Sequence, residues 1–218
     1  MATTVEFEFR NARYRSAEKG LKAFGKALAA DWDGSAKTLS NELRSFLDSV
    51  AQALTTRHGQ AWPGGTGEKT LSTRSGKLMK SIVDSVSVSG TTIETIEGTI
   101  GSDLVYAGIQ EFGGTIRAKR VKYLTIPLKA ALDAHGVPLK RSARDWENTF
   151  VARSKAGNLI IFQKNGASIT PLYVLKTSVY IPPRLGLRAT LTAGLPYFVE
   201  KAMDAMVKAV IAAKGATA

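Results

Sequence analysis

Residue types that carry most catalytic and metal chemistry are scarce in this chain of 218 residues. It contains no cysteine, which excludes disulfides, thiolate zinc sites and cysteine nucleophiles. Its two histidines, His58 and His135, have neither a carboxylate nor a second histidine at a spacing typical of metal ligands. We therefore predict no metal, no cofactor and no catalytic site. The missing cysteines also fit folding in a reducing cytoplasm.

The sequence shows no nucleotide-binding or hydrolase signature. The chain has no Gly-x-Ser-x-Gly and no phosphate-binding Gly-x-x-x-x-Gly-Lys-Ser/Thr sequence. Gly64-Gly-Thr-Gly67, followed by Glu68 and Lys69, is slightly similar to a phosphate loop, but it follows a helix and a proline rather than a strand. No acidic residues form a recognisable acid–base pair, although a pair formed in space, and with it an enzyme of another type, stays open as an alternative.

Positive charge is concentrated in one part of the chain, whose formal net charge is +12. Residues 1–116 balance at 13 basic and 13 acidic side chains. Residues 117–188 hold 14 basic residues against only Asp133, Asp145 and Glu147. This asymmetry predicts a surface that meets something anionic, either nucleic acid or an acidic protein; the alternative is a solvated, charge-rich loop face.

The residues proposed for this contact follow a tight basic cluster. They are Arg117, Lys119, Arg120 and Lys122, with Arg141 and Arg144 further along the chain, and Arg153 and Lys155 add charge nearby. Tyr123 adjoins the cluster, which could neutralise several phosphates. No helix-turn-helix, zinc-finger or aromatic RNA-binding signature accompanies it, so we do not expect base reading. A basic rim that docks on an acidic ring explains the same residues.

Periodicity predicts the elements that must position these residues. A short strand carries Val5, Phe7 and Phe9, and helical spacing covers 16–30 and 34–58, with Gly59 ending the second helix. Residues 60–73 read as a loop, after which Ser72 or Thr73 is available to cap a short helix over 74–83. Helix-like spacing returns at 104–112, where Gly113 and Gly114 break it.

Strand signals dominate the middle of the chain, and a helix closes it. Expected strands are 86–88 and 93–100 across a turn at 89–91, then 122–128, 149–153, 158–164 and 173–181. The helix over 187–213 has one apolar stripe and contains Pro196, which marks a kink or the helix start; the stripe is Leu191, Leu195, Phe198, Ala202, Met206, Val210 and Ala213. The fold class is α+β, with N-terminal helices, a mostly antiparallel sheet built from hairpins and a C-terminal packing helix.

The expected domain organisation has two parts in one compact unit. Residues 1–72 hold the N-terminal strand, helices and loop, and residues 73–218 hold an α+β domain with a basic hairpin arm around 140–180. No segment approaches the ~20 uninterrupted apolar residues that a membrane span needs. We therefore expect no membrane partner.

Three short segments together resemble one family. They are Arg74-Ser-Gly-Lys-Leu-Met-Lys-Ser-Ile82, Tyr106-Ala-Gly-Ile-Gln-Glu-Phe-Gly-Gly114, and Leu124-Thr-Ile-Pro-Leu128 with Val179-Tyr-Ile-Pro-Pro-Arg184. In order and spacing, over about residues 70–215, they are similar to bacteriophage tail-completion (virion morphogenesis, head–tail joining, minor tail) proteins. Two positions depart from the pattern: Gln110 stands where histidine is common, and no aromatic follows Arg184.

The resemblance implies a structural virion protein of the neck or tail top. Such a protein forms a homo-oligomeric ring, with a hexamer favoured, that completes the tail or joins it to the DNA-filled head. Its partners would be its own copies, neighbouring neck and tail ring proteins and, non-specifically, the exiting DNA. It would be made and assembled in the bacterial host cytoplasm. The alternative is a basic nucleic-acid-binding protein without a virion role.

The motif residues have structural interpretations. Tyr106, Ile109 and Phe112 lie at three-residue spacings, one helical face suited to docking on a sheet. Glycines after that face let two backbones approach closely, and two prolines later end a strand sharply. Glu111 is expected to pair with Arg184, within the subunit or across to a neighbour. The predicted interface or structural residues are Ser75, Gly76, Tyr106, Glu111, Phe112, Gly113, Gly114, Pro182, Pro183 and Arg184.

Overall fold

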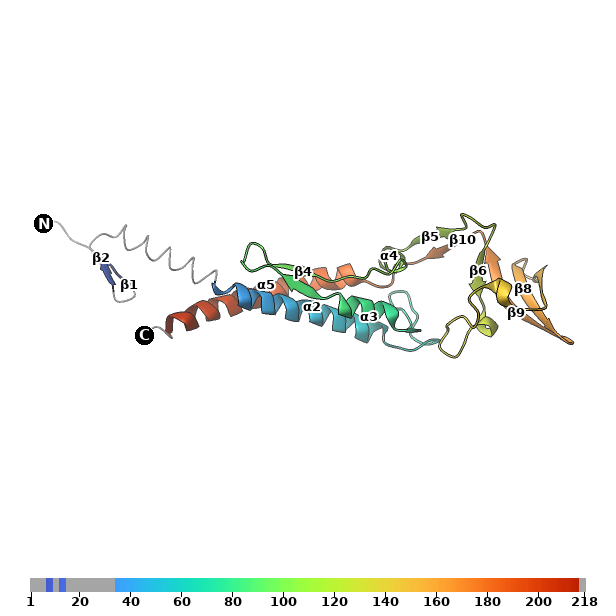
Figure 1. Cartoon of the computed structure of the whole chain (residues 1–218), viewed down its shortest axis with the longest axis horizontal. Helices are drawn as coiled ribbons and strands as arrows, with labels where there is room; N and C mark the ends of the chain where they lie inside the picture. Colours follow the sequence, from blue (N-terminus) through green and yellow to red (C-terminus); the bar gives the residue numbers. More distant parts are fainter. Residues whose placement is uncertain (1–6, 10–11, 15–33, 216–218) are drawn as a thin grey trace. The chain divides into compact units, whose positions relative to one another are not determined.

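The computed structural model describes residues 7–9, 12–14 and 34–215 (Figure 1). The helix predicted over 16–30, and Val5 of the first strand, lie outside these residues. Within them, β1 (Phe7–Phe9) pairs antiparallel with β2 (Ala12–Tyr14). The predicted α+β class is confirmed: along the sequence, antiparallel hairpins lie between a long helix near the N-terminus and a long helix near the C-terminus.

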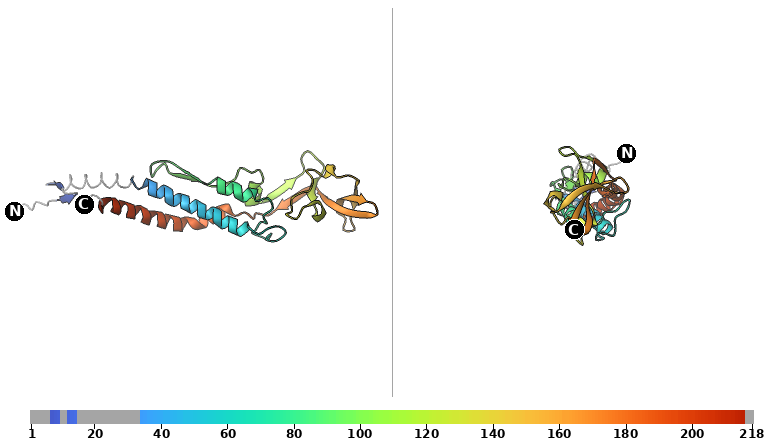
Figure 2. Two further views of the ribbon diagram at one scale, coloured as in Figure 1. Left: turned by 60° about the horizontal axis from the view of Figure 1, so that its bottom comes forward. Right: turned by 90° about the vertical axis from the view of Figure 1, so that its right-hand side faces the viewer.

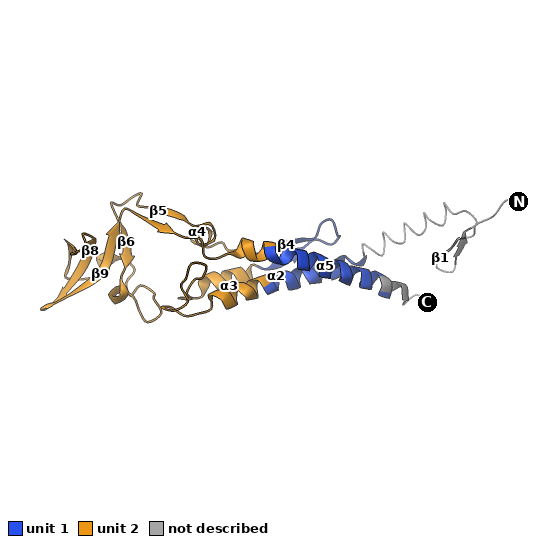
Figure 3. Cartoon of the chain, turned by 180° about the vertical axis from the view of Figure 1, so that it is seen from behind, with its two compact units in different colours: residues 1–49, 86–100, 193–218 blue, residues 50–85, 101–192 orange. Residues whose placement is uncertain are grey.

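The chain divides into two compact units, coloured separately in Figure 3. Unit 1 is residues 1–49, 86–100 and 193–218, and unit 2 is residues 50–85 and 101–192. Each unit therefore draws on distant parts of the sequence, and the boundary expected at residue 72 stays a prediction. No helix within the described residues has both the length and the apolar character that crossing a bilayer requires.

Unit 1 contains the N-terminal part of α2 (Ala36–His58) and most of α5 (Leu187–Gly215), which pack antiparallel (Figures 1 and 2). The rings of Phe46 and Phe198 stack with centroids 5.0 Å apart. One turn away, Lys201 Nζ lies 2.9 Å from a Glu42 carboxylate oxygen. These two contacts run in opposite directions along the two helices, as antiparallel packing requires. Ala202, Met206 and Val210 of the predicted stripe are buried.

The α5 helix carries a second apolar stripe, which the structure leaves exposed. It runs at four-residue spacing through Leu195, Val199, Met203 and Val207, which are 39%, 55%, 47% and 44% exposed. The sequence placed Leu195 on one stripe with Ala202 and Met206, whereas in the structure Leu195 belongs to this exposed face. Pro196 lies inside the helix rather than starting it.

A hairpin completes unit 1. β3 (Ser87–Ser89) pairs antiparallel with β4 (Glu97–Thr99), which confirms the predicted hairpin with shorter strands. A Cβ on Gly98 would fall 2.8 Å from Leu47 Cδ1, so β4 lies directly against α2 and a larger residue there would displace leucine side chains of α2.

Unit 2 is built around a four-stranded antiparallel sheet in the order β6-β9-β8-β7. Its strands are β6 (Leu124–Pro127), β7 (Thr149–Arg153), β8 (Leu159–Asn165) and β9 (Ser168–Lys176). The hairpins predicted in the 140–180 region are β7–β8 and β8–β9, with turns at the expected positions. Ala131, Leu172 and Tyr173 form its core, and Trp146 Nε1 donates to Tyr173 Oη at 3.0 Å.

The strand predicted over 173–181 is in fact two strands. β9 ends at Lys176, and β10 (Ser178–Ile181) pairs with a different partner, β5 (Gly114–Arg117), in a separate two-stranded ribbon. Periodicity continues across Thr177 because both pieces are extended, and only pairing separates them. β10 ends where Pro182 follows, as predicted.

Candidate functional site

The first family-like segment, residues 74–82, follows a loop that side-chain hydrogen bonds close, and it contains the start of a helix that has no side-chain cap. α3 (Lys77–Asp84) starts after Gly76, whose φ is 70°. Ser72 and Thr73 were predicted as caps, and this was wrong: their hydroxyls donate to the carbonyls of Gly64 and His58. Both hydroxyls bind carbonyl groups earlier in the chain, so they close the loop over 60–73 instead of capping α3.

His58 ends α2, as predicted, and fastens three segments of unit 2. Its ring is 1% exposed. Leu71 N–H donates to Nδ1 at 3.1 Å, so the proton is on Nε2, which donates to the Leu185 carbonyl at 2.9 Å. Burial lowers the pKa of His58, helped by nearby Arg57 and opposed by the bond to Leu185. Both ring nitrogens are occupied, so this histidine acts as a structural pin rather than as a base.

The second segment forms α4 (Ala107–Phe112) and a tight exit from it. Gly113 has φ 69°, and a Cβ there would lie 2.7 Å from Pro183 Cδ and 3.0 Å from the Ile181 carbonyl oxygen. The predicted close approach of two backbones is confirmed, and the second backbone belongs to the third segment. Glycine is required on both grounds, the left-handed conformation and the lack of space.

Glu111 caps the N-terminus of α5. Its carboxylate accepts hydrogen bonds from the backbone N–H of Leu187 at 2.8 Å and of Arg188 at 2.9 Å. Free N–H groups and the positive end of the helix dipole make this position favourable for a carboxylate. This role of Glu111 was not predicted from the sequence. The available signal was that α5 begins after Gly186 with no capping side chain of its own.

The predicted pairing of Glu111 with Arg184 is not what the subunit uses. Arg184 Nε donates instead to the Gly67 carbonyl at 2.9 Å. Its backbone N–H, with that of Leu185, donates to the Gln110 carbonyl at 2.8 and 2.9 Å. The Glu111 side chain thus joins α4 to the start of α5, whereas the Arg184 side chain joins the chain after β10 to the loop at Gly67.

All three family-like segments meet around one cavity of about 440 Å³ in unit 2. Arg74, Gly76 and Met79 line it from the first segment, Tyr106 and Gln110 from the second, and Ile181 and Arg184 from the third. Arg74 is braced by a 2.8 Å bond from Nη1 to the Gly136 carbonyl and lies over the Trp62 ring. Two anchored arginines suit the cavity to an acidic or carbonyl-bearing group.

Around α4 and the β5–β10 ribbon, which we call the α4/β10 junction (residues 104–117 and 178–188), large apolar side chains stand in solvent. Tyr106 and Phe112 were predicted to dock on a sheet, and this was wrong: they are 44% and 70% exposed, and Ala107 is the buried residue of α4. The other exposed members are Val105, Ile116 and Tyr180.

The predicted anion-contact residues fall into two groups. Arg117 is exposed at the end of β5, and Lys119, Arg120 and Lys122 are exposed on the β5–β6 connection. Arg141 and Arg144 are also exposed: Arg144 belongs to the short 3-10 helix Ala143–Asp145, and Arg141 lies two residues before it. Ala143 of this helix packs on the sheet core with Trp146. Tertiary structure adds Lys176, which sequence analysis missed because it lies far along the chain.

Among the described residues, no three His, Asp or Glu side chains gather closely enough to hold a metal ion. Comparisons with known protein families, with curated proteins and with solved structures find no match for this chain.

Proposed function

We propose that this protein is a structural component of a phage virion that forms a ring at the neck or tail top, where it completes the tail or joins it to the DNA-filled head. In this proposal the protein acts through interfaces between its copies and with the rings above and below, and not through catalysis. The virion is then its location, after assembly in the bacterial host cytoplasm.

The α4/β10 junction carries this proposal. The segments that resemble tail-completion proteins are built into one interlocked structure, in which Glu111 caps α5 and Gln110 holds the chain after β10. That structure leaves Phe112 70% and Tyr180 65% exposed. Monomeric soluble proteins seldom leave several large apolar side chains together in water, and such surfaces mark contacts with other proteins.

The second exposed stripe, on α5, supports self-association in the same way. Leu195, Val199, Met203 and Val207 cover one helix face beside the face that packs on α2. A helix that is apolar on most of its circumference is usually buried. A closed ring gives both surfaces of each copy a partner.

A basic nucleic-acid-binding protein without a virion role is the second candidate. The observation that favours it is charge: unit 2 contains 19 basic and 7 acidic residues, and so carries the whole formal net charge of +12. This candidate accounts for the charge but leaves the exposed apolar residues of the α4/β10 junction without a role.

Native mass spectrometry and sedimentation at low and high salt separate the two. A ring protein is expected to run as one discrete oligomer that persists at high salt, because apolar contacts are not screened. Negative-stain images should show closed rings, and particles assembled without the protein should lack a completed neck. A monomer at every concentration and salt, with tails complete in its absence, would refute the proposal.

A further inference from the structure

We propose that one end of the four-stranded sheet binds the phosphate backbone of duplex DNA without reading its sequence. The inference rests on the proposed function, since it names the polymer that a neck ring surrounds. Its first support is strand register. Arg153 pairs with Leu159, Leu159 with Leu175, and Leu124 with Lys176, so these positions lie together at one end of the sheet.

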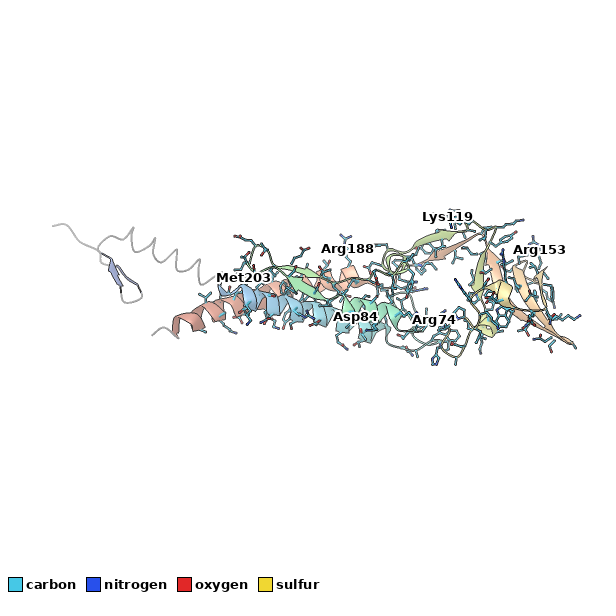
Figure 4. The ribbon with its side chains drawn as sticks, in the orientation of Figure 1. Arg74, Asp84, Lys119, Arg153, Arg188 and Met203 are labelled. Carbon is cyan, nitrogen blue, oxygen red and sulfur yellow. The ribbon has the colours of Figure 1, made fainter. Side chains whose placement is uncertain are left out.

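The β5–β6 connection joins the same end. Ala118 N–H donates to the Thr177 carbonyl at 3.0 Å, which holds residues 118–123 beside the end of β9. The β7–β8 turn, residues 154–158, closes the end on the far side. The basic residues so collected are Arg117, Lys119, Arg120, Lys122, Arg153, Lys155 and Lys176, which we call the basic end. Figure 4 labels Lys119 and Arg153.

All seven side chains of the basic end are exposed, and none forms an ion pair with another described residue. Their fixed contacts leave the charge in place: Lys176 Nζ donates to Asn158 Oδ1 at 2.8 Å, and Arg153 Nη1 to the Gly157 carbonyl at 3.2 Å. Lys122 Nζ lies 5.5 Å from the centre of the Tyr123 ring. These contacts direct the side chains without neutralising them.

The three acidic residues of this region are placed elsewhere or already engaged. Asp133 accepts from the backbone N–H of His135 and Val137, and Asp145 from that of Ser142. Glu147 lies by the opposite end of the sheet, since its carbonyl accepts from Gln163, which pairs with Thr149 and Thr170. The basic end is therefore a surface of one sign.

A phosphate backbone fits this surface better than an acidic protein does. Four of the seven residues are lysines, which are depleted in protein–protein interfaces but common in contacts with phosphates. The basic end contains no acidic residue that could pair with the cations found on most protein surfaces. A DNA backbone, in contrast, presents negative charge only. Long, exposed lysine and arginine side chains neutralise phosphates whatever the base sequence, so contact with the backbone is enough to explain this surface.

Fluorescence anisotropy of a short labelled duplex with the full chain, between roughly 50 and 200 mM salt, tests the proposal. The variant K119Q/R120Q/K122Q removes three charges of the basic end. The control K37Q/K77Q/K164Q removes the same charge from exposed residues outside the basic end. Each lost phosphate contact should reduce the slope of log affinity on log salt by about 0.9, so we expect a fall of roughly 2 to 3 for the variant and less than about 1 for the control.

Equal losses in both variants would overturn the inference, because general charge would then suffice. Polyglutamate that binds the wild type more tightly than the duplex does, and loses binding in K119Q/R120Q/K122Q, would overturn it in favour of an acidic protein. Sedimentation of the same samples keeps the two proposals apart. If the protein forms rings but its DNA binding does not depend on the basic end, only the inference is refuted. If a monomer binds DNA through the basic end, only the proposed ring is refuted.

Discussion

At the scale of single residues, His58 shows how burial turns a titratable group into a fastening. It receives a hydrogen bond at Nδ1 from Leu71 and gives one from Nε2 to Leu185. A proton added at Nδ1 would replace the lone pair that accepts from Leu71. The folded state therefore resists protonation, which agrees with a pKa lowered from 6.5 by burial.

Because of this residue, the free energy of unfolding should decrease as the pH is lowered. Below about 6.5, the unfolded chain takes up the proton before the folded chain does, so the contribution of His58 is complete above that pH and is lost as pH falls through the lower, folded pKa. We expect the melting temperature to drop between pH 7 and 5. In His58→Leu, this part of the pH dependence should disappear, whereas the exposed His135→Gln should keep it; an unchanged profile in His58→Leu would contradict the assignment.

Glu111 offers a second test at this scale. Replacing it by alanine removes two hydrogen bonds to the first turn of α5 and a favourable charge at the helix terminus. We expect a loss of about 1–2 kcal/mol in the free energy of unfolding, measured by urea denaturation. Glu147→Ala, at an exposed carboxylate of the same net charge, is the control and should change it by less than ~0.5 kcal/mol. Equal effects of the two would argue against the cap.

At the scale of elements, two family-like segments are held together by contacts between backbones. The Gln110 carbonyl of α4 accepts hydrogen bonds from the chain after β10, and β5 pairs with β10 over four residues. Such an arrangement needs close approach, and Gly113 supplies it. The two prolines 182 and 183 fix the facing segment in an extended form, so little has to be ordered when the pieces meet.

Gly113→Ala should therefore destabilise the protein by roughly 1–3 kcal/mol, since it places a Cβ against Pro183 in a left-handed conformation. Gly108→Ala, inside the helix that Gly113 follows, is the control, because nothing lies within 4 Å of a Cβ there. Its helical position should make it neutral or stabilising by up to ~1 kcal/mol. Thermal unfolding of both variants measures the difference, and a Gly113→Ala protein as stable as Gly108→Ala would rule out the close approach.

At the scale of the whole molecule, the distribution of charge and of exposed apolar side chains over the two units is not visible in any short segment of the sequence. Unit 1 holds 11 basic and 11 acidic residues, while unit 2 holds the entire net charge. Apolar side chains stand in solvent in both units. A protein whose folded subunit leaves such surfaces open is expected to gain stability from assembly.

Phe112→Ser with Tyr180→Ser should weaken that assembly without unfolding the subunit. Both side chains are mostly in solvent, at 70% and 65% exposed, so their removal costs the isolated chain little. In an oligomer that covers them, their loss should raise the dissociation constant by tenfold or more, because burial of each large apolar side chain is worth about 1.5–3 kcal/mol. Sedimentation velocity measures this; Val151→Ser, at an exposed β7 residue outside the α4/β10 junction, is the control. Unaltered assembly of the double variant would remove the junction from the ring interface.

The sequence by itself was enough for the elements that repeat a local pattern. Periodicity located α2, the hairpins β3–β4, β7–β8 and β8–β9, and the long helix α5, because alternation and recurrence every turn are local properties of extended and helical chain. In α2 and α5, part of the recurring apolar residues is also what the fold buries. Turn residues marked the breaks at Gly113 and Pro182. It also located the basic region, since charge is a property of composition.

Tertiary structure alone decided which residues meet. The partner of Glu111 lies 76 positions away at the start of α5, and that of Arg184 lies 117 positions away in the loop at Gly67. The division of 173–181 into β9 and β10 likewise depends on pairing with strands that are distant in sequence. Local spacing contains no information about such contacts, because the free energy that selects them comes from burial and hydrogen bonds between segments that only the folded chain brings together.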